Sequence, residues 1–345
     1  MYEQAMGFTE KPFSLLPDSG FLFLGKKHKA ALSMLEYGLM NRAAFSVITG
    51  EIGCGKTTLV RYLLDQLESN VTVGLITNTH ESLGDILQLV LLAFNLKSSG
   101  AEKIDRLQTF TNFVIGEYAK DQSVVLIIDE AQHMNMSKLE ELRMLSNINA
   151  DKHLVLQVVL VGQPELREIL YSAELVQFSQ RLMVDYHLGP LDLEETGEYI
   201  RHRLKVAGGK PSTFRRDSYE IIYRYTGGVP RLINITCDTA LNYAFAAKKK
   251  TVNAEIVRTV LRDKVLSALR PRSQTFVASA DPIFDAQTNE WDFGSDDIQR
   301  LDSNFRELLQ DAGTGIDDEP DGEQMDEVKR TMLRELFSTG RDEES

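Results

Sequence analysis

Apolar residues fall into two kinds of pattern along the first 190 residues, and the two patterns alternate. The runs at 45–48, 124–128 and 155–161 are nearly continuous, as is typical of parallel strands buried on both faces. Between them, apolar residues recur at every third or fourth position, which is the period of an amphipathic helix. The patterns predict strands at 45–48, 71–77, 124–128, 155–161 and 184–188, and helices at 27–39, 59–64, 82–95, 103–119 and 137–147.

The strand-like runs stop after Pro190. The helical period continues, and it predicts helices at about 193–207, 215–225, 230–247 and 253–269. Alternating strands and helices predict a doubly wound α/β sheet, followed here by a small all-α domain. We therefore expect four regions: a lead-in at 1–40 packed on the core, an α/β core at 41–190, a helical lid at 191–269 and a tail at 270–345.

Charge separates the tail from the rest of the chain. Of 51 acidic and 38 basic residues, 20 acidic and 6 basic ones lie in 273–345, a net charge of −14. The other residues carry 31 acidic and 32 basic side chains, a net charge of +1. A nearly neutral body neither demands nor excludes nucleic acid. The tail is rich in Asp, Gly and Ser, and we expect it to be largely disordered.

Two segments of the tail nevertheless carry the helical period. Isolated segments of this length bury too little surface to fold alone, so two interpretations stay open: nascent helices, or motifs that dock on a protein partner. The apolar positions are Ile298, Leu301, Phe305 and Leu308 in the first segment, and Met325, Val328, Met332 and Leu336 in the second.

The sequence gives little sign of export or of a membrane span. The two cysteines, Cys54 and Cys237, have no paired spacing, which suits a reducing compartment. The first 17 residues lack the apolar core of a signal peptide. No apolar stretch approaches the roughly 18–20 residues that cross a bilayer. We expect a cytoplasmic protein that reaches the inner membrane only through a partner.

The strongest chemical signal follows the strand at 45–48. Residues 50–58 read Gly-Glu-Ile-Gly-Cys-Gly-Lys-Thr-Thr and precede a helix, which is the context of a P-loop. Glycines let backbone N–H groups turn toward a polyphosphate at the helix N-terminus. Lys56 is expected to reach the β- and γ-phosphates, and the Thr57 hydroxyl to coordinate Mg²⁺. The predicted nucleotide-binding residues are Gly50, Gly53, Cys54, Gly55, Lys56, Thr57 and Thr58, with ATP and Mg²⁺ as cofactors.

Two carboxylates, Asp129 and Glu130, end the buried strand 124–128. A strand-end Asp holds Mg²⁺ in P-loop enzymes, and an adjacent carboxylate can deprotonate the attacking water. An acidic strand end that merely faces solvent is the plain alternative. The P-loop about 70 residues upstream, with another strand between, favours the nucleotidases that have an added strand and a catalytic Glu. Asp-Glu-Ala-Gln is like a helicase box, but the accompanying helicase motifs are missing.

Three further residues are candidates for catalysis. Gln163 follows the strand at 155–161, where its side chain would lie between the P-loop strand and the Asp129 strand, near the γ-phosphate; a polar turn residue is the alternative. Arg181 precedes the last strand, and Arg stabilises charge on a transferring phosphoryl group; it would serve a neighbouring subunit, unless it is a surface arginine. Arg231 follows Pro230 in the first turn of a lid helix, where a cation is disfavoured by the helix dipole. Its presence there suggests an anionic partner such as the γ-phosphate; a purely structural arginine is the alternative.

Together these motifs resemble the P-loop AAA+ ATPases of the general secretion pathway protein A (ExeA) type. The resemblance covers about 1–266 and is nearest to the ATPases found beside exosortase and exopolysaccharide loci. Transposition ATPases share the same parts more distantly. The residues that carry it are Gly50–Thr58, Asp129–Gln132, Leu139–Asn147, Val161–Leu166, Gln180-Arg181 and Gly227–Asn234, with Gly7-Phe8, Pro12-Phe13, Pro17-Asp18 and His28 at the start.

The resemblance implies a role for each candidate residue. Asp129 and Glu130 would be the Walker B pair, Gln163 sensor 1, Arg181 an arginine finger acting in trans within a homo-oligomer, and Arg231 sensor 2. The resemblance also implies a protein partner in envelope secretion or polysaccharide export. The family's membrane helix and periplasmic peptidoglycan-binding domain have no counterpart here, which argues against wall remodelling.

Three functions therefore remain as hypotheses. The first is an ATP-hydrolysing switch of an export system. The second is a DNA-associated ATPase that regulates transposition, which the balanced charge of the body does not favour. The third is a scaffold that holds nucleotide without hydrolysing it. The candidate catalytic residues Glu130 and Arg181 argue against this third hypothesis.

Overall fold

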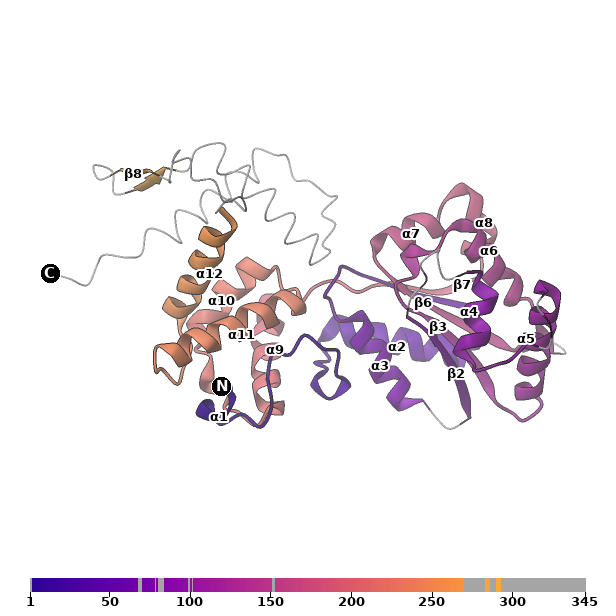
Figure 1. Ribbon diagram of the computed structural model, residues 1–345, viewed down its shortest axis with the longest axis horizontal. Coiled ribbons are helices and arrows are strands. Elements are labelled where there is room, and N and C mark those ends of the chain that lie inside the picture. Colours follow the sequence, from indigo (N-terminus) through magenta and orange to yellow (C-terminus); the bar gives the residue numbers. More distant parts are fainter. Residues whose placement is uncertain are drawn as a thin grey trace. The chain divides into compact units, whose positions relative to one another are not determined.

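A computed structural model describes residues 2–67, 70–77, 79, 84–98, 100, 102–150, 153–269, 283–285 and 290–292. The chain divides into two compact units. One unit is Leu16–Pro190, and the other joins Met1–Leu15 to Leu191–Ser345 (Figure 1). The chain therefore crosses between the units twice, after residue 15 and after residue 190.

The unit Leu16–Pro190 is built on a five-stranded sheet in the order β2-β3-β6-β1-β7. Every neighbouring pair in this sheet is parallel. The carboxyl ends of β3, β6 and β1, which are adjacent, therefore lie at one edge of the sheet. The strands are β1 (Phe45–Thr49), β2 (Val71–Ile76), β3 (Ser123–Ile128), β6 (Leu156–Gly162) and β7 (Leu182–His187).

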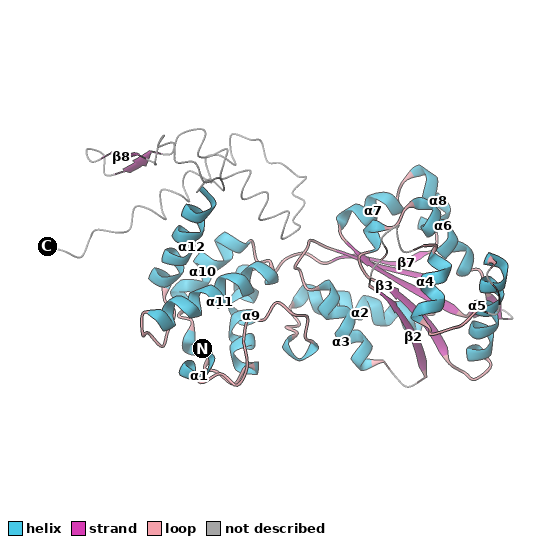
Figure 2. Cartoon of the chain, in the orientation of Figure 1, coloured by secondary structure: helices cyan, strands magenta, loops and turns pink. Residues whose placement is uncertain are grey.

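Alternate residues of each central strand face opposite sides of this sheet, as the pleat requires. In β3, Leu126 and Ile128 belong to one apolar cluster, and Val125 and Ile127 to the other. Helices α4 to α8 contribute apolar side chains to the cluster of Leu126 and Ile128. Helices α2 and α3 contribute to the cluster of Val125 and Ile127 (Figure 2). The helices are α2 (Lys26–Met40), α3 (Lys56–Gln66), α4 (Ile86–Ala93), α5 (Lys103–Tyr118), α6 (Met136–Leu145), α7 (Pro164–Leu170) and α8 (Val176–Ser179).

The other unit is mainly helical in its described part. Helix α9 starts with a capping box, in which Asp192 and Glu195 each bind the other's backbone N–H. Pro230 opens α11 after the N-cap Val229, which follows the left-handed Gly227 and Gly228, in agreement with the helix boundary expected there. The long helices are α9 (Leu193–Val206), α10 (Arg216–Thr226), α11 (Pro230–Ala246) and α12 (Ala254–Leu269).

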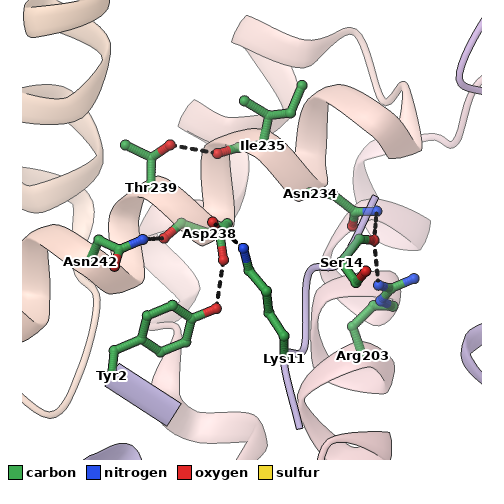
Figure 3. A network of polar contacts seen from close by, with 9 residues as sticks. All are labelled: Tyr2, Lys11, Ser14, Arg203, Asn234, Ile235, Asp238, Thr239 and Asn242. Carbon is green, nitrogen blue, oxygen red and sulfur yellow. Dashed lines mark hydrogen bonds and ion pairs between the residues drawn. The ribbon is translucent and has the colours of Figure 1, made fainter. Parts of the chain in front are cut away.

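We expected the whole lead-in 1–40 to pack on the α/β core, and this is wrong for residues 1–15. Helix α1 (Tyr2–Met6) lies against α11. The Tyr2 hydroxyl donates to Asp238 Oδ1 at 2.6 Å, and Lys11 pairs with Asp238 Oδ2 at 3.1 Å. Arg203, which is buried, donates to the carbonyl of Pro12 at 2.7 Å. It also donates to the carbonyl of Ser14 at 3.0 Å (Figure 3). These contacts make residues 2–14, the N-terminal strap, a part of the helical unit.

Arg203→Met is expected to release the strap. A hydrogen bond with a charged donor contributes about 1.5–3 kcal/mol, so the free energy of unfolding should fall by about that much. A protease that cleaves after glutamate should then cut after Glu10 faster than in the wild type. Lys205→Met, an exposed change on the same helix, should alter neither the stability nor the cleavage rate. Equal cleavage rates in the wild type and Arg203→Met would contradict the strap's anchoring.

Several short elements were not expected from the sequence. Residues Asn149–Ala150 and His153–Leu154 form a small antiparallel pair. A second pair, Ile283–Asp285 with Glu290–Asp292, lies in the acidic tail. The rest of the tail, including its two amphipathic segments at 298–308 and 325–336, is outside the described residues. Among the residues that are described, no helix is both long and apolar enough to cross a bilayer.

Candidate active site

The loop after β1 has a backbone path that requires glycine. Gly53 and Gly55 have φ of 83° and 95°, values that residues with a side chain rarely adopt. A Cβ on Gly50 would collide with the carbonyl oxygen of Leu188, and a Cβ on Gly55 would lie 3.2 Å from His28 Nε2. Side chains are therefore excluded at Gly50 and Gly55 by close packing and at Gly53 and Gly55 by the backbone conformation.

Helix α3 begins at the end of this loop. Its N-cap, Gly55, offers no side chain to the first-turn N–H groups, and those groups carry the positive end of the helix dipole. An uncapped helix start behind a glycine loop fits the phosphates of a nucleotide. The predicted phosphate-binding role of residues 50–58 thus has a matching local geometry.

Lys56 is folded back across the loop. Its side chain is buried, and Nζ donates to the carbonyls of Gly50 and Glu51 at 2.5 and 3.0 Å. Burial lowers the pKa of Lys56, and the charges of Glu130, Asp129 and Glu51 partly offset this. The ammonium therefore lies in a poorly solvated position inside the loop, where its field on an anion is strong.

Thr57 and Asp129 meet at the same edge. The Thr57 hydroxyl donates to Asp129 Oδ2 at 2.7 Å, and the Glu130 N–H donates to Asp129 Oδ1 at 2.9 Å. Burial raises the pKa of Asp129, while its two hydrogen bonds oppose the rise. A hydroxyl and a carboxylate in contact suit Mg²⁺, which takes one or two protein oxygens and fills its octahedron with water and phosphate.

Glu130 follows Asp129 in an unusual backbone conformation. Its φ is 53°, in the left-handed region that side chains disfavour. The Thr79 hydroxyl donates to the Glu130 carbonyl at 3.0 Å. The carboxylate itself accepts from Gln132 Nε2 at 2.7 Å. Backbone strain of this kind persists only where the surrounding structure holds it, and it is common at active sites.

Gln163 directly follows β6, which lies between β1 and β3 as expected. Its side chain is half-buried, and its N–H donates to Gln132 Oε1 at 3.1 Å. The ends of three adjacent strands thus bring together the P-loop, the pair Asp129-Glu130, and Gln163. Gln132 joins the last two, and the sequence analysis did not select it.

Arg181 is not part of this group. It precedes β7, whose first residue pairs with Phe45, the first residue of β1. The P-loop follows the other end of β1, five residues along, or about 16 Å at the usual rise of a strand. Arg181 instead donates to Ser146 Oγ at 3.0 Å, after the end of α6. It lies at the opposite edge of the sheet from its own subunit's loop.

Arg231 belongs to the helical unit. It is the second residue of α11, and its side chain is exposed. A sensor role for Arg231 stays a prediction.

Comparison with known proteins agrees with this geometry. Residues 40–170 match the family described as an AAA domain. The general secretion pathway protein A of Aeromonas hydrophila is 38% identical over 260 residues, which are 74% of this chain and 47% of that protein. The predicted resemblance to general secretion pathway protein A is confirmed. The chain spans about half the length of that relative.

Solved structures show the same fold at low sequence identity. The ORC2 protein of Aeropyrum pernix, in ADPNP–ADP complexes, has a TM-score of 0.54 at 17% identity, covering 95% of this chain and 90% of that one. The ORC1 protein of the same organism, in complex with DNA, has a TM-score of 0.55 at 14% identity, covering 95% and 87%. The protein has the P-loop AAA+ fold.

His28 is a second residue to which the sequence motifs assigned no role, and it contacts the backbone of the P-loop. His28, buried in α2, has Nε2 2.9 Å from the Cys54 carbonyl. Cys54 itself is buried, and burial raises the pKa of its thiol to about 11. A thiol with that pKa is almost wholly protonated near neutrality and reacts slowly, so Cys54 serves as a small apolar residue of the AAA+ core.

Gly55→Ala is expected to damage this loop. A left-handed conformation destabilises an ordinary residue by about 1–2 kcal/mol, and the new methyl group would press on His28. The urea midpoint should fall, and affinity for a fluorescent ATP analogue should drop. Gly116→Ala is the matched control, because nothing lies within 4 Å of a Cβ on that helical glycine; it should be neutral or stabilising. An unchanged urea midpoint and an unchanged nucleotide affinity in Gly55→Ala would refute the proposal that this loop requires glycine and binds the phosphates.

Proposed function

We propose that the protein hydrolyses ATP, with Mg²⁺, to ADP and phosphate and acts as an oligomeric switch. The observation that carries this proposal is the group of Lys56, Thr57, Asp129 and Glu130 at one edge of the sheet. The glycine loop leads into the start of α3, where no side chain caps the backbone N–H groups. The match to an AAA domain supports the same activity.

Each residue of the group has a distinct task. The loop N–H groups and Lys56 would hold the phosphates, and Thr57 and Asp129 would hold Mg²⁺. Bound Mg²⁺ supplies charge neutralisation on the phosphate oxygens. Glu130 accepts a proton from the water whose oxygen attacks the terminal phosphorus, and the bond from that phosphorus to the bridging oxygen breaks. The Gln163 side chain would report the terminal phosphate to the rest of the fold.

Arg181 completes the site of a neighbouring subunit in this proposal. Arg181 directly precedes the first residue of β7, whereas the P-loop follows the last residue of β1, and these two strands are paired in parallel. A residue that stabilises transferring phosphoryl charge has to touch the phosphate, and Arg181 can do so only across a subunit boundary. We therefore propose a homo-oligomer in which hydrolysis depends on contact between subunits, with Arg231 sensing nucleotide from the helical unit.

The pathway is proposed from the relative in Aeromonas hydrophila, which is named for general secretion. We propose that the chain acts in the cytoplasm on a protein partner of an envelope export system. The narrower assignment, export of exopolysaccharide, rests on the motif resemblance described above. The acidic tail, with its two amphipathic segments, is the proposed docking element for that partner.

The test is the ATPase rate per subunit, measured as a function of protein concentration. In the wild type the rate should rise as subunits associate. In Arg181→Ala the rate should stay low at every concentration. It should lie about 10²–10³-fold below the wild-type rate, as expected when one charge-stabilising group is lost. Arg224→Ala is the control, because Arg224 is exposed and pairs with Glu220 on the same helix. A concentration-independent rate that Arg181→Ala leaves unchanged would refute the shared site.

Double-stranded DNA is added in a parallel series to test transposition as the alternative. An export ATPase should be indifferent to it. Stimulation by DNA that weakens steeply with salt would indicate phosphate contacts, and would replace export by the DNA-associated function.

A further inference from the structure

Gln132 joins two residues of the proposed catalytic group. It lies in the single turn Ala131–His133 that follows the pair Asp129-Glu130. Its Nε2 donates to Glu130 Oε2 at 2.7 Å, and its Oε1 accepts the Gln163 N–H at 3.1 Å. We propose that Gln132 is a positioning residue, which fixes the Glu130 carboxylate relative to the end of β6. This inference rests on the proposed function, in which Glu130 is the general base.

The main chain of Glu130 is held by other residues. Thr79 donates to the Glu130 carbonyl at 3.0 Å, and Lys138 Nζ donates to the Thr79 carbonyl at 3.1 Å. Lys138 and Thr79 are both buried. What these bonds leave undetermined is the direction of the Glu130 side chain, which has several rotatable bonds. Gln132 is the residue whose bond sets that direction.

The contact leaves Glu130 ready to act. Oε2 is bonded to Gln132, while Oε1 accepts no hydrogen bond from any residue in the described part of the chain. A carboxylate held by one oxygen presents the other to a water molecule. The second N–H of the Gln132 amide has a partner too, since Nε2 lies 3.3 Å from His133 Nε2. The amide is thus fixed from three sides.

The end of β6 is shaped for this amide. A Cβ on Gly162 would lie 2.9 Å from Gln132 Oε1 and 2.8 Å from Leu166 Cδ2. Real Cβ atoms do not make such contacts, so glycine at this position lets the amide reach the Gln163 N–H. The close approach is an observation independent of the hydrogen bonds, and it points to the same pairing.

The first experiment compares two replacements of nearly equal length. Gln132→Met removes both bonds. Gln132→Glu keeps an acceptor for the Gln163 N–H but replaces the donor to Glu130 with a carboxylate. Both should lower kcat by at least about tenfold, as partial loss of general-base catalysis would, with affinity for a fluorescent ATP analogue within about twofold of the wild type. Gln108→Met, on an exposed face of α5, is the control and should change neither quantity.

A double-mutant cycle separates positioning from a general structural role. If Gln132 acts through Glu130, then Gln132→Met should not lower the residual rate any further in the Glu130→Gln background. Gly162→Ala tests the same point in a second way. Its methyl group should displace the Gln132 side-chain oxygen while Gln132 itself is left unchanged. This variant should also lower kcat more than it weakens binding.

The outcomes distinguish this inference from the function on which it rests. If Glu130→Gln abolishes turnover while Gln132→Met and Gly162→Ala both leave kcat unchanged, the positioning role is wrong and the proposed function stands. Equal losses from Gln132→Met in both backgrounds would also overturn it, as an independent structural effect. If Glu130→Gln itself leaves turnover unchanged, the proposed function and this inference fail together.

Discussion

Lys56→Met is expected to abolish nucleotide binding while leaving the fold intact. The ammonium lies inside the P-loop and is the cation that the loop offers to the phosphates. Loss of a preorganised charge of this kind lowers turnover by at least about a hundredfold. Binding is affected as well, because this charge acts on the ground state and the transition state alike.

The fold should tolerate the change because Lys56 is poorly solvated in the folded chain. Burial lowers its pKa, which means that folding disfavours its charged form relative to the unfolded chain. Below the ordinary lysine pKa, the charged group therefore opposes folding, and Met of similar length removes that opposition. The unfolding midpoint without nucleotide should be equal to or above that of the wild type.

Thermal unfolding with and without MgATP measures both effects at once. A ligand at about 100 times its Kd stabilises a protein by about 2.7 kcal/mol, so the wild type should melt at a higher temperature with MgATP. Lys56→Met should show no such shift. Lys97→Met, at an exposed position outside the P-loop, should respond like the wild type. A full nucleotide shift in Lys56→Met would show that the ligand lies elsewhere.

The sequence predicted the α/β core well because the signals there are local. A buried strand such as 124–128 is a continuous apolar run, and the observed β3 covers it. The P-loop could be placed because Gly53 and Gly55 need positive φ, and few other residues allow it. The position of β6 between β1 and β3 was expected too, because Gln163 was assigned a place between the P-loop and Asp129.

The N-terminal strap could not be predicted in this way. Its anchors are far apart in the sequence: Arg203 and Pro12 are separated by 191 residues, and Tyr2 and Asp238 by 236. A buried arginine that satisfies two carbonyls leaves no periodic pattern in either segment. The short helices α7 and α8 were missed for a related reason, since one or two turns contain too few positions to show a helical period.

The candidate site shows the same division. Residues with a recurrent motif, such as Lys56 and Asp129, were identified from spacing. Gln132 and His28 were not assigned roles, because their importance lies in contacts with Glu130 and with the Cys54 carbonyl. The position of Arg181 before the last strand was visible in the sequence, but its distance from its own P-loop became clear only from the register of β7 on β1.

Glu130→Gln is expected to separate binding from hydrolysis. Glutamine has the size of glutamate but cannot accept the proton of the attacking water, so turnover should fall by about 10²–10⁴-fold. The Mg²⁺ oxygens of Thr57 and Asp129 and the charge of Lys56 stay in place, so affinity for MgATP should be unchanged. Glu168→Gln, on the exposed side of α7, is the control and should hydrolyse ATP at the wild-type rate.

Mixing this variant with Arg181→Ala tests the shared site directly. An Arg181→Ala subunit keeps a complete P-loop and Glu130, and lacks what its neighbour must supply; a Glu130→Gln subunit keeps Arg181. If Arg181 acts across the boundary, the mixture should regain activity that neither variant shows alone, because some boundaries then combine an intact Glu130 with an intact Arg181. If Arg181 acted within its own subunit, or only through its bond to Ser146, mixing would restore nothing, since every subunit would still carry one defect.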